Sequence, residues 1–455
     1  MSNDRKTIFA LSSGRPPAAI AVIRISGPNA RSGLLATCGR IPEPRRASVA
    51  RVRDPATQEI IDEALVLWFP GPGSETGEDM AELQVHGGRA IVAQLFDVLG
   101  RLEGFRMAEP GEFTRRAFEH GRLDLTAIEG LADLIAADTQ AQRRQAFRQF
   151  RGLLGNRVET WRGRLIEALA LVEAGIDFSD EDVPLDLVAR AFELIRPLLG
   201  EIREAGAARQ GERLREGLRV AIAGAPNVGK STLLNRLARR DAAIVSPHAG
   251  TTRDVIEAHL DLKGFPVTLG DTAGLREAND PVEQEGVRRA WDAVSDADLV
   301  LWVIDAAEIE GGLMLAQRQG ASADTQHWLL INKTDLLADG RRLVARLAAQ
   351  LRGQILLTIS AKTGAGVDAL VDALAEFAER FFTREPALVT RERHRVALQD
   401  AGHALEAALR LGPQGGEELV AEHIRLATRA LERLTGRVGV EDILDVIFRD
   451  FCIGK

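Results

Sequence analysis

One segment near the middle of the chain has the residue types and spacing of a phosphate-binding loop. GAPNVGKS occupies positions 224–231, after a short apolar run and before the helix-forming stretch STLLNRLA. Glycines let backbone N–H groups curl around phosphate oxygens, and the N-terminus of a helix adds positive potential. Lys230 can reach the β- and γ-phosphates of a nucleoside triphosphate, and the Ser231 hydroxyl can ligate Mg²⁺. A glycine turn without function could have the same sequence, so further motifs are needed to identify a nucleotide site.

Two further motifs have the order and spacing of a nucleotide switch. AGTTRD at 249–254 supplies Thr252, which can ligate Mg²⁺ only when a γ-phosphate is present. DTAG at 271–274 follows VTLG, which we interpret as the end of a strand. Asp271 is then placed to hold the metal through water, and the Gly274 N–H can contact the γ-phosphate. Each motif alone could be a turn or a helix cap, but together they predict a nucleotide switch.

The motif NKTD at 332–335 predicts which base is bound. Asp335 can accept hydrogen bonds from N1 and N2 of guanine in a bidentate, charge-assisted pair. Adenine lacks this pair of donors and would leave the carboxylate unpaired, at roughly 1–3 kcal/mol or more. The motif SAK at 360–362 ends the next predicted strand, where a backbone N–H can contact guanine O6. The sequence therefore predicts a GTPase and not an ATPase.

The group that orients the attacking water is not evident from the motifs. Leu275 stands where many GTPases have a glutamine, and leucine cannot perform that task. Glu283 is a candidate at the start of the next predicted helix, where it could equally be an ordinary N-terminal carboxylate. Arg253 and Arg276 could supply positive charge as arginine fingers or be solvated. A monovalent cation is the third possibility, with the amide oxygen of Asn227 as one ligand.

The elements around these motifs indicate several domains, because 455 residues are too many for one ordinary core. The pattern up to about residue 120 is mixed α and β, with strand-like runs at 19–26, 64–69 and 81–85 and a helical run at 89–102. Helical periodicity follows, an α/β alternation begins at 218, and helical periodicity returns at 385. In the α/β part the clearest predicted strands are 299–305, 327–332 and 355–360. The two helical stretches could form one bundle into which the α/β module is inserted, or two unrelated segments.

Composition restricts the class of protein further. The chain is 45% hydrophobic and 27% charged, and it contains no apolar stretch of about eighteen residues that could span a bilayer. The N-terminus lacks the apolar segment of a signal peptide, and two cysteines are too few for a disulfide framework. We therefore expect a cytoplasmic protein without a membrane partner. The net charge of −8 means that any nucleic-acid contact must come from a local basic patch.

Taken together, the motifs resemble the MnmE family (also called TrmE), GTPases that act on the wobble uridine of certain tRNAs. The resemblance spans essentially the whole chain, through VIRISGPNA, PGEFTRRAFEHGRLDL, NVGKSTLLN, AGTTRD, DTAGLREANDPVEQEGVRRAW, NKTDL and the terminal FCIGK. It implies an N-terminal α+β domain at 1–120 that binds folate and dimerises. It also implies a discontinuous α-helical domain, at 121–217 and at 381–455 with the C-terminal tail. The inserted α/β P-loop G domain would occupy 218–380.

The resemblance also implies K⁺-stimulated GTP hydrolysis in which G domains meet across the nucleotides. The K⁺ contacts would be Asn227, Ser246, the His248 backbone and Thr251. Ser231 and Thr252 would bind Mg²⁺, and Glu283 occupies the catalytic glutamate position. Further GTP contacts would come from Val228, Gly229, Thr232, Pro247, Ala249, Gly250, Thr272, Ala273, Asn332, Lys333, Thr334, Ser360, Ala361 and Lys362. The segment SPHAG replaces the common TDIAG, which keeps a hydroxyl in the cation loop but changes its neighbours.

In the N-terminal domain the resemblance implies a tetrahydrofolate one-carbon carrier, 5-formyl- or methylene-tetrahydrofolate. Arg24, Glu82, Arg122 and Lys455 match its contacts, although Arg122 stands where a lysine is usual. The implied reaction adds an aminomethyl or carboxymethylaminomethyl group at C5 of the tRNA wobble uridine. It requires a homodimer and a partner of the MnmG (GidA) type, which carries the FAD and completes a heterotetramer. The alternative from the residues is a GTP-binding switch in ribosome assembly.

Overall fold

The computed structural model describes residues 6–177, 187–239, 257–271, 294–318, 325–337, 355–382, 387–412, 416–438, 444, 447–448 and 454. The chain forms two compact units. The first comprises Met1–Ala132, Gln149–Leu198 and Asp400–Lys455, and the second comprises Asp133–Arg148 and Leu199–Gln399. Among the helices in the described ranges, none is both long and apolar enough to cross a membrane.

The first unit begins with a six-stranded sheet in the order β3-β4-β5-β2-β1-β6. Its strands are β1 (Thr7–Leu11), β2 (Ala18–Ser26), β3 (Ser48–Arg53), β4 (Ile60–Phe69), β5 (Met80–Gly87) and β6 (Phe105–Met107). Side chains alternate between the faces of a strand, and accordingly Ala64, Val66 and Trp68 of β4 are buried while Leu65 is exposed. The helices α1 (Ala30–Cys38) and α2 (Arg89–Arg101) cover the buried face and share its hydrophobic core. The predictions for 19–26, 64–69, 81–85 and 89–102 are confirmed as β2, β4, β5 and α2.

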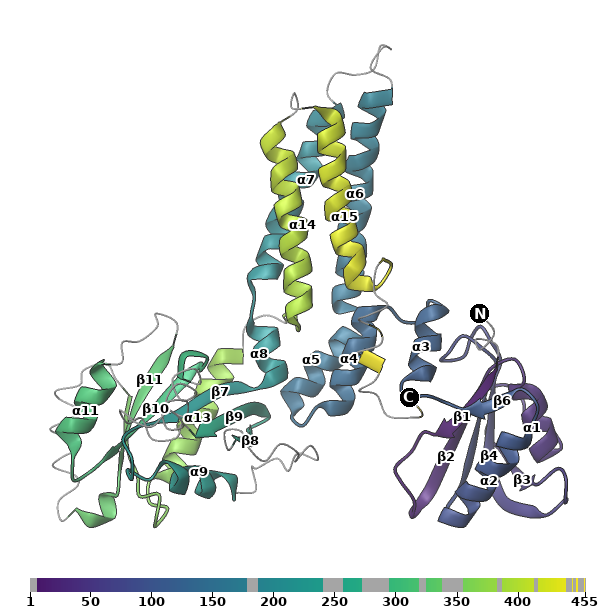
Figure 1. Cartoon of the computed structure of the whole chain (residues 1–455), viewed down its shortest axis with the longest axis horizontal. Helices are drawn as coiled ribbons and strands as arrows, with labels where there is room; N and C mark the ends of the chain where they lie inside the picture. The colour runs from purple at the N-terminus through teal and green to yellow at the C-terminus, as the bar shows by residue number, and fades with distance from the viewer. Residues whose placement is uncertain are drawn as a thin grey trace, which may run out of the picture. The chain divides into compact units, whose positions relative to one another are not determined.

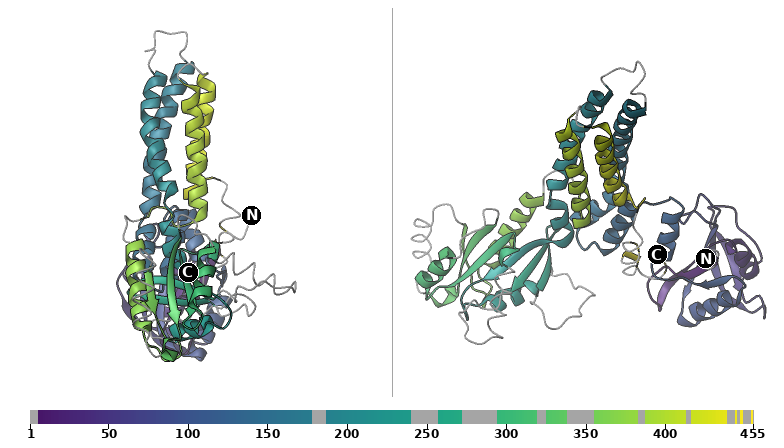
Figure 2. Two further views of the ribbon diagram at one scale, coloured as in Figure 1. Left: turned by 90° about the vertical axis from the view of Figure 1, so that its left-hand side faces the viewer. Right: turned by 45° about the horizontal axis from the view of Figure 1, so that its top comes forward.

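Helices α6 and α15 come from opposite ends of the helical sequence and lie side by side within the first unit (Figures 1 and 2). Ion pairs of 2.8 Å join Arg162 to Glu432 and Arg425 to Glu173 across this contact. The predicted discontinuous helical fold is therefore confirmed. The helices following β6 are α3 (Glu112–Glu119), α4 (Leu125–Ala136), α5 (Gln140–Phe150), α6 (Leu153–Asp177), α7 (Leu187–Ala207), α8 (Gln210–Glu216), α14 (Glu392–Leu411) and α15 (Glu417–Thr435).

The second unit contains a six-stranded sheet in the order β12-β11-β10-β7-β9-β8, parallel except for the β8–β9 hairpin. Its elements are β7 (Leu218–Ala223), α9 (Lys230–Ala238), β8 (Glu257–Leu262), β9 (Phe265–Asp271), β10 (Leu299–Asp305), α11 (Ile309–Arg318), β11 (Gln326–Asn332), the short 3₁₀ helix η1 (Thr334–Leu336), β12 (Ile355–Thr358) and α13 (Val367–Phe382). Strands β7, β10 and β11 are almost continuously apolar because helices cover both faces. Helices α9 and α13 pack on one face and α11 on the other, so the predicted α/β fold is confirmed (Figure 1).

Parallel pairing brings the predicted nucleotide motifs to one edge of this sheet. The strands β9, β7, β10, β11 and β12 are consecutive neighbours, so their carboxyl ends lie along the same edge. Ligands of open α/β sheets bind in the crevice outside such ends. The motifs at 224–231, 271–274, 332–335 and 360–362 all begin there.

Candidate functional site

The loop between β7 and α9 has a backbone that only particular residues can adopt. Gly224 has a φ of +148°, and a Cβ added to it would lie 2.3 Å from the carbonyl oxygen of Val303. Gly229 has a φ of +99°, and its added Cβ would lie 2.4 Å from Nδ2 of Asn332. Asn227 has a φ of +63° and is exposed on the turn. The two glycines therefore permit the close approach that the predicted phosphate loop requires.

Lys230 and Ser231 open α9 directly after this loop. The ammonium group of Lys230 donates to the carbonyl oxygens of Gly224 and Ala225, at 3.0 and 2.9 Å. Its side chain is buried against the loop that it would share with the phosphates. Ser231 and Thr232 are exposed in the first helical turn, where the positive end of a helix favours an anion. Val228 of the loop is buried, and the assignment of Ser231 to Mg²⁺ stays a prediction.

Asn332 links the phosphate loop to the loop that follows β12. Its amide nitrogen donates to the carbonyl oxygen of Val228 at 2.7 Å, and its amide oxygen accepts from the Ala361 N–H at 2.9 Å. The side chain is only 2% exposed, so neither bond is in competition with bulk water. Both functional groups of one amide are thereby used to hold two nucleotide motifs together.

The residues after Asn332 turn the chain toward solvent. Lys333 has a φ of +63°, and its ammonium group lies 2.7 Å from the Asp305 carboxylate at the end of β10. Burial alone would raise the pKa of Asp305, but bonds from the Ala307 N–H and Lys333 lower the pKa below its ordinary value. Thr334 donates through its hydroxyl to the Ile359 carbonyl at 2.9 Å. Asp335 follows on η1 with an exposed side chain, which is compatible with its predicted contact to a base.

The loop at 360–362 is held by hydrogen bonds within the loop and from α9. Ser360 is fully buried, and its hydroxyl accepts from the Thr363 N–H at 3.1 Å. Arg236 of α9 donates to the carbonyl oxygens of Ala361 and Lys362. The loop therefore has a defined backbone beside Asn332, at the place predicted to read guanine O6.

Several predicted site residues lie outside the described residues. Asp271 ends β9 beside Ile222, and its backbone position alone is described. The other predicted contacts outside the described ranges are Ser246, Pro247, His248, Ala249, Gly250, Thr251, Thr252, Thr272, Ala273, Gly274, Glu283 and Lys455. Leu275, Arg253 and Arg276 are also outside them. The assignments of these residues stay predictions.

Arg24 and Glu82, both expected to contact a folate, pair with each other in the N-terminal sheet. They face each other on the neighbouring strands β2 and β5, with 3.0 Å between Nη2 and Oε1. The Arg24 guanidinium also lies 3.0 Å from the Glu75 carboxylate, and it stands over the Phe113 ring at 5.8 Å. Arg24 thus has a fixed direction, set by two carboxylates and an aromatic ring.

The other predicted folate residues lie near the end of α3 and in the C-terminal tail. Arg122 is exposed, and its backbone N–H donates to the Ala117 carbonyl at 2.7 Å. Lys455 is outside the described residues, but its neighbour Gly454 accepts a hydrogen bond from the Ser12 hydroxyl at 2.7 Å. This bond places the described part of the tail at the end of β1.

Three contacts in these sites were not found by reading the sequence. Glu75 lies in FPGPGSETGED, where the glycines and prolines indicate only a turn. Phe113 belongs to a quoted motif, but helical spacing does not show which side chain an aromatic ring meets. Asp305 ends a predicted strand, and its contact with Lys333 arises because β10 pairs with β11 in the sheet.

Models of two protein families match the chain. The MnmE helical domain matches residues 125–452, and the GTP-binding protein TrmE N-terminus matches residues 7–122. Together these matches include both the N-terminal sheet and the α/β sheet.

Full-length relatives are also similar. The tRNA modification GTPase MnmE of Bradyrhizobium sp. (strain ORS 278) is 57% identical over 456 residues, which cover 99% of each chain. The protein of the same name from Rhodopseudomonas palustris (strain BisB18) is 54% identical and is covered completely, 100% of each chain. The solved structure of Aquifex aeolicus Era bound to GDP·AlF₄⁻ covers 42% of this chain and 66% of that chain, with 28% identity and a TM-score of 0.30.

Proposed function

The chain belongs to the MnmE family of tRNA modification GTPases, and from this we propose that K⁺-dependent GTP hydrolysis drives its part in wobble-uridine modification. With an FAD-dependent partner of the MnmG type, the product would be an aminomethyl or carboxymethylaminomethyl group at C5 of that uridine. The observation that carries the nucleotide part is Asn332, which holds the phosphate loop and the 360–362 loop together through its two amide bonds. Family membership favours tRNA modification over a switch in ribosome assembly.

Among the described residues, one group would bind the phosphates of GTP and another would bind the guanine base. Lys230 would exchange its loop carbonyl partners for phosphate oxygens and balance charge between the β- and γ-phosphates. The Ser231 hydroxyl would hold Mg²⁺, which neutralises charge on the phosphates when it is bound. The exposed Asp335 would pair with guanine N1 and N2, while the backbone near Ala361 would contact O6.

Potassium would supply the positive charge that the motifs leave unassigned. Asn227 supports this proposal because its positive φ exposes the side chain on the phosphate loop, where an amide oxygen suits a monovalent cation. Ser246, the His248 backbone and Thr251 would be the other ligands. Glu283 would take over the orientation of water, since Leu275 has no polar group.

GTP turnover is expected to be about tenfold or more faster in KCl than in NaCl of the same concentration, because a missing cation leaves developing phosphate charge unbalanced. Phosphate release by purified protein measures this difference. Glu283→Ala should remove most of the turnover, and Glu285→Ala is the matched control two residues away. Equal rates in the two salts would contradict the potassium proposal, and an unaffected Glu283→Ala protein would contradict the glutamate assignment.

The N-terminal sheet would bind a tetrahydrofolate derivative at Arg24, Glu82, Arg122 and Lys455. Its support is chemical: a cation suits the folate carboxylates, and a carboxylate suits the donors of a pterin ring. The carboxylates of Glu75 and Glu82 keep the Arg24 guanidinium in one direction, which reduces the entropy lost on binding. Titration with 5-formyltetrahydrofolate tests this site, and no binding at saturating ligand would refute it.

A homodimer through the N-terminal domain is also proposed. Val49 and Leu65 face each other on β3 and β4, and both are exposed, as are Ile20 and Ile60 of the same sheet. An apolar sheet face of this kind is suited to a second copy of the chain. Light scattering that gave the mass of one chain at micromolar concentration would contradict the dimer.

A further inference from the structure

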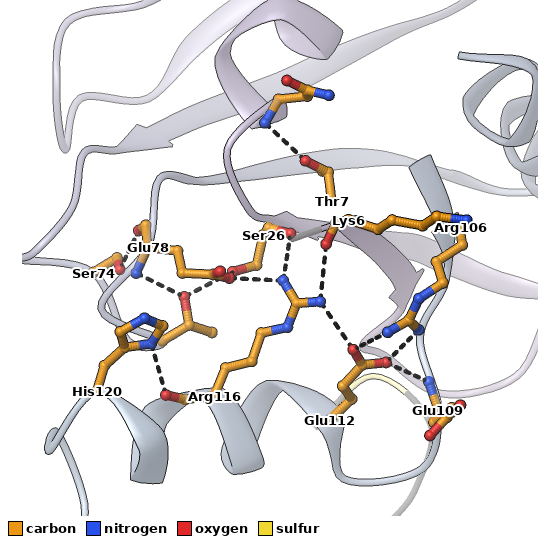
Figure 3. Close-up of polar contacts among 12 residues, drawn as sticks. Lys6, Thr7, Ser26, Ser74, Glu78, Arg106, Glu109, Glu112, Arg116 and His120 are labelled. Carbon is orange, nitrogen blue, oxygen red and sulfur yellow. Dashed lines mark hydrogen bonds and ion pairs between the residues drawn. The ribbon is translucent and has the colours of Figure 1, made fainter. Parts of the chain in front are cut away.

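A buried polar network in the first unit centres on the guanidinium of Arg116, on α3 (Figure 3). Nη1 of Arg116 lies 2.9 Å from the Glu78 carboxylate, and Nη2 lies 2.9 Å from the Glu112 carboxylate. Nη2 also donates to the Lys6 carbonyl at 2.9 Å. The side chain of Arg116 is 6% exposed, so these bonds are largely shielded from water. One guanidinium therefore joins α3, the start of β1 and the loop that contains Glu78.

That loop, residues 74–78 between β4 and β5, is held from the sheet as well. The Ser26 hydroxyl at the end of β2 donates to the Glu78 carboxylate at 2.8 Å and lies 2.7 Å from the Thr76 hydroxyl. Ser26 and Thr76 are both completely buried. The Ser74 hydroxyl closes the loop by donating to the Glu78 carbonyl (Figure 3). The 74–78 loop consequently has anchors at both of its ends.

The same loop contacts two of the predicted ligand residues. Glu75 makes the 3.0 Å ion pair with Arg24. Gly77 has a φ of +82°, and a Cβ added to it would lie 2.7 Å from Cβ of His120 and 3.5 Å from Cγ of Arg122. The segment that carries Arg122 therefore packs directly on the loop.

Arg24 is held from the other side by α3, which carries both Arg116 and Phe113. The Phe113 ring lies under the Arg24 guanidinium, one helical turn before Arg116. Arg116 thus ties together the two elements that touch Arg24, although it does not touch Arg24 itself. A lysine could not reproduce this arrangement, because one ammonium group lacks the planar fork that reaches several acceptors at once.

The charges of the network are balanced within the protein. Arg106 pairs with both oxygens of the Glu112 carboxylate, with 2.7 Å between Nη1 and Oε2 and 2.5 Å between Nη2 and Oε1, the oxygen that Arg116 also contacts. Burial alone would raise the pKa of Glu112, but bonds from Arg106, the Glu109 N–H and Arg116 lower it below its ordinary value. Arg116 and its carboxylates are thus mutually satisfied, so the network itself presents no unpaired charge to a ligand.

We infer that Arg116 is a positioning residue for the N-terminal ligand site. By fixing the 74–78 loop and α3, it sets the directions of Arg24 and Arg122 toward the carboxylates of a folate-type ligand. This inference rests on the proposed tetrahydrofolate binding. Arg116 would influence Arg24 through Glu75 and Phe113, and Arg122 through Gly77.

The test is calorimetric titration of the full-length protein with 5-formyltetrahydrofolate. Arg116→Lys should weaken binding about tenfold or more, because a small displacement of a clamping group is costly to a bound ligand. The control Arg101→Lys alters an ion pair elsewhere in the same unit, between Arg101 of α2 and Asp54, and should bind as wild type does. Normal wild-type binding with an unaffected Arg116→Lys protein would overturn the inference alone. Failure of the wild type to bind would overturn the folate proposal and the inference with it.

A double-mutant cycle separates positioning from general destabilisation. If Arg116 acts through Arg24, then Arg116→Lys should weaken the binding of 5-formyltetrahydrofolate less than about threefold in an Arg24→Lys background. The reason is that both substitutions then disturb the same contact with the ligand. If the losses in binding free energy from the two substitutions were fully additive, Arg116 would not act through Arg24. Glu78→Gln supplies a second route to the same result if Arg116→Lys folds poorly, since it weakens the loop anchor while it preserves the shape of the side chain. Wild-type affinity in a folded Glu78→Gln protein would also count as refutation.

Discussion

Replacement of Lys230 by alanine is expected to lower GTP turnover about 10²–10³-fold, the range seen when one preorganised charge contact to a transition state is removed. Within the described segment 224–231, Lys230 is the only cationic side chain. The Lys230 ammonium is buried within the loop, 3.0 and 2.9 Å from the Gly224 and Ala225 carbonyls, directly where the loop turns into α9. An alanine would leave the loop without its own cation.

Single-turnover GTP hydrolysis measures this effect apart from nucleotide release. Arg239→Ala is the matched control, because it removes an exposed cation from the other end of the same helix. A Lys230→Ala protein that hydrolyses GTP within threefold of wild type, roughly 0.6 kcal/mol in activation free energy, would show that the loop is not the phosphate site.

Replacement of Asn332 by alanine is expected to act on both folding and binding. The Val228 carbonyl and the Ala361 N–H would each lose a buried partner, so the free energy of unfolding should fall by about 2–4 kcal/mol. GTP binding should weaken more than about tenfold in addition, because the phosphate loop and the 360–362 loop would no longer be held at one separation.

Urea unfolding and fluorescent-nucleotide titration distinguish the two parts of this prediction. Asn235→Ala is a suitable control, since this asparagine is exposed on α9 and should change neither quantity. Lower stability with unchanged GTP affinity would mean that Asn332 supports the fold but does not set the nucleotide loops.

Much of the nucleotide site was predictable because its motifs follow buried parallel strands. The apolar runs before GAPNVGKS and NKTD are typical of buried parallel strands, and β7 and β11 confirm them. Since parallel strands present their carboxyl ends at one edge, the relative placement of the motifs followed from topology. The role of Asn332 as a bridge did not follow, because it depends on the distance between two loops that are far apart in the sequence.

The N-terminal sheet was harder to predict in detail. Strands β1, β3 and β6 were not predicted, since β6 has three residues and the alternation in β3 is shared with many exposed segments. The register that pairs Arg24 with Glu82 is set by tertiary contacts across β2 and β5. The motif that contains Arg116 can be identified in the sequence. The contacts of Arg116 cannot, because they join residues that only the tertiary structure brings together.

Mass spectrometry of tRNA nucleosides from cells that lack this protein tests the proposed function most directly. In these cells the C5 positions at the wobble uridines of the affected tRNAs should be unmodified. Expression of the wild-type chain should restore the modification, and the Lys230→Ala chain should not restore it. Wobble uridines that remain fully modified in the absence of the protein would contradict the proposed function.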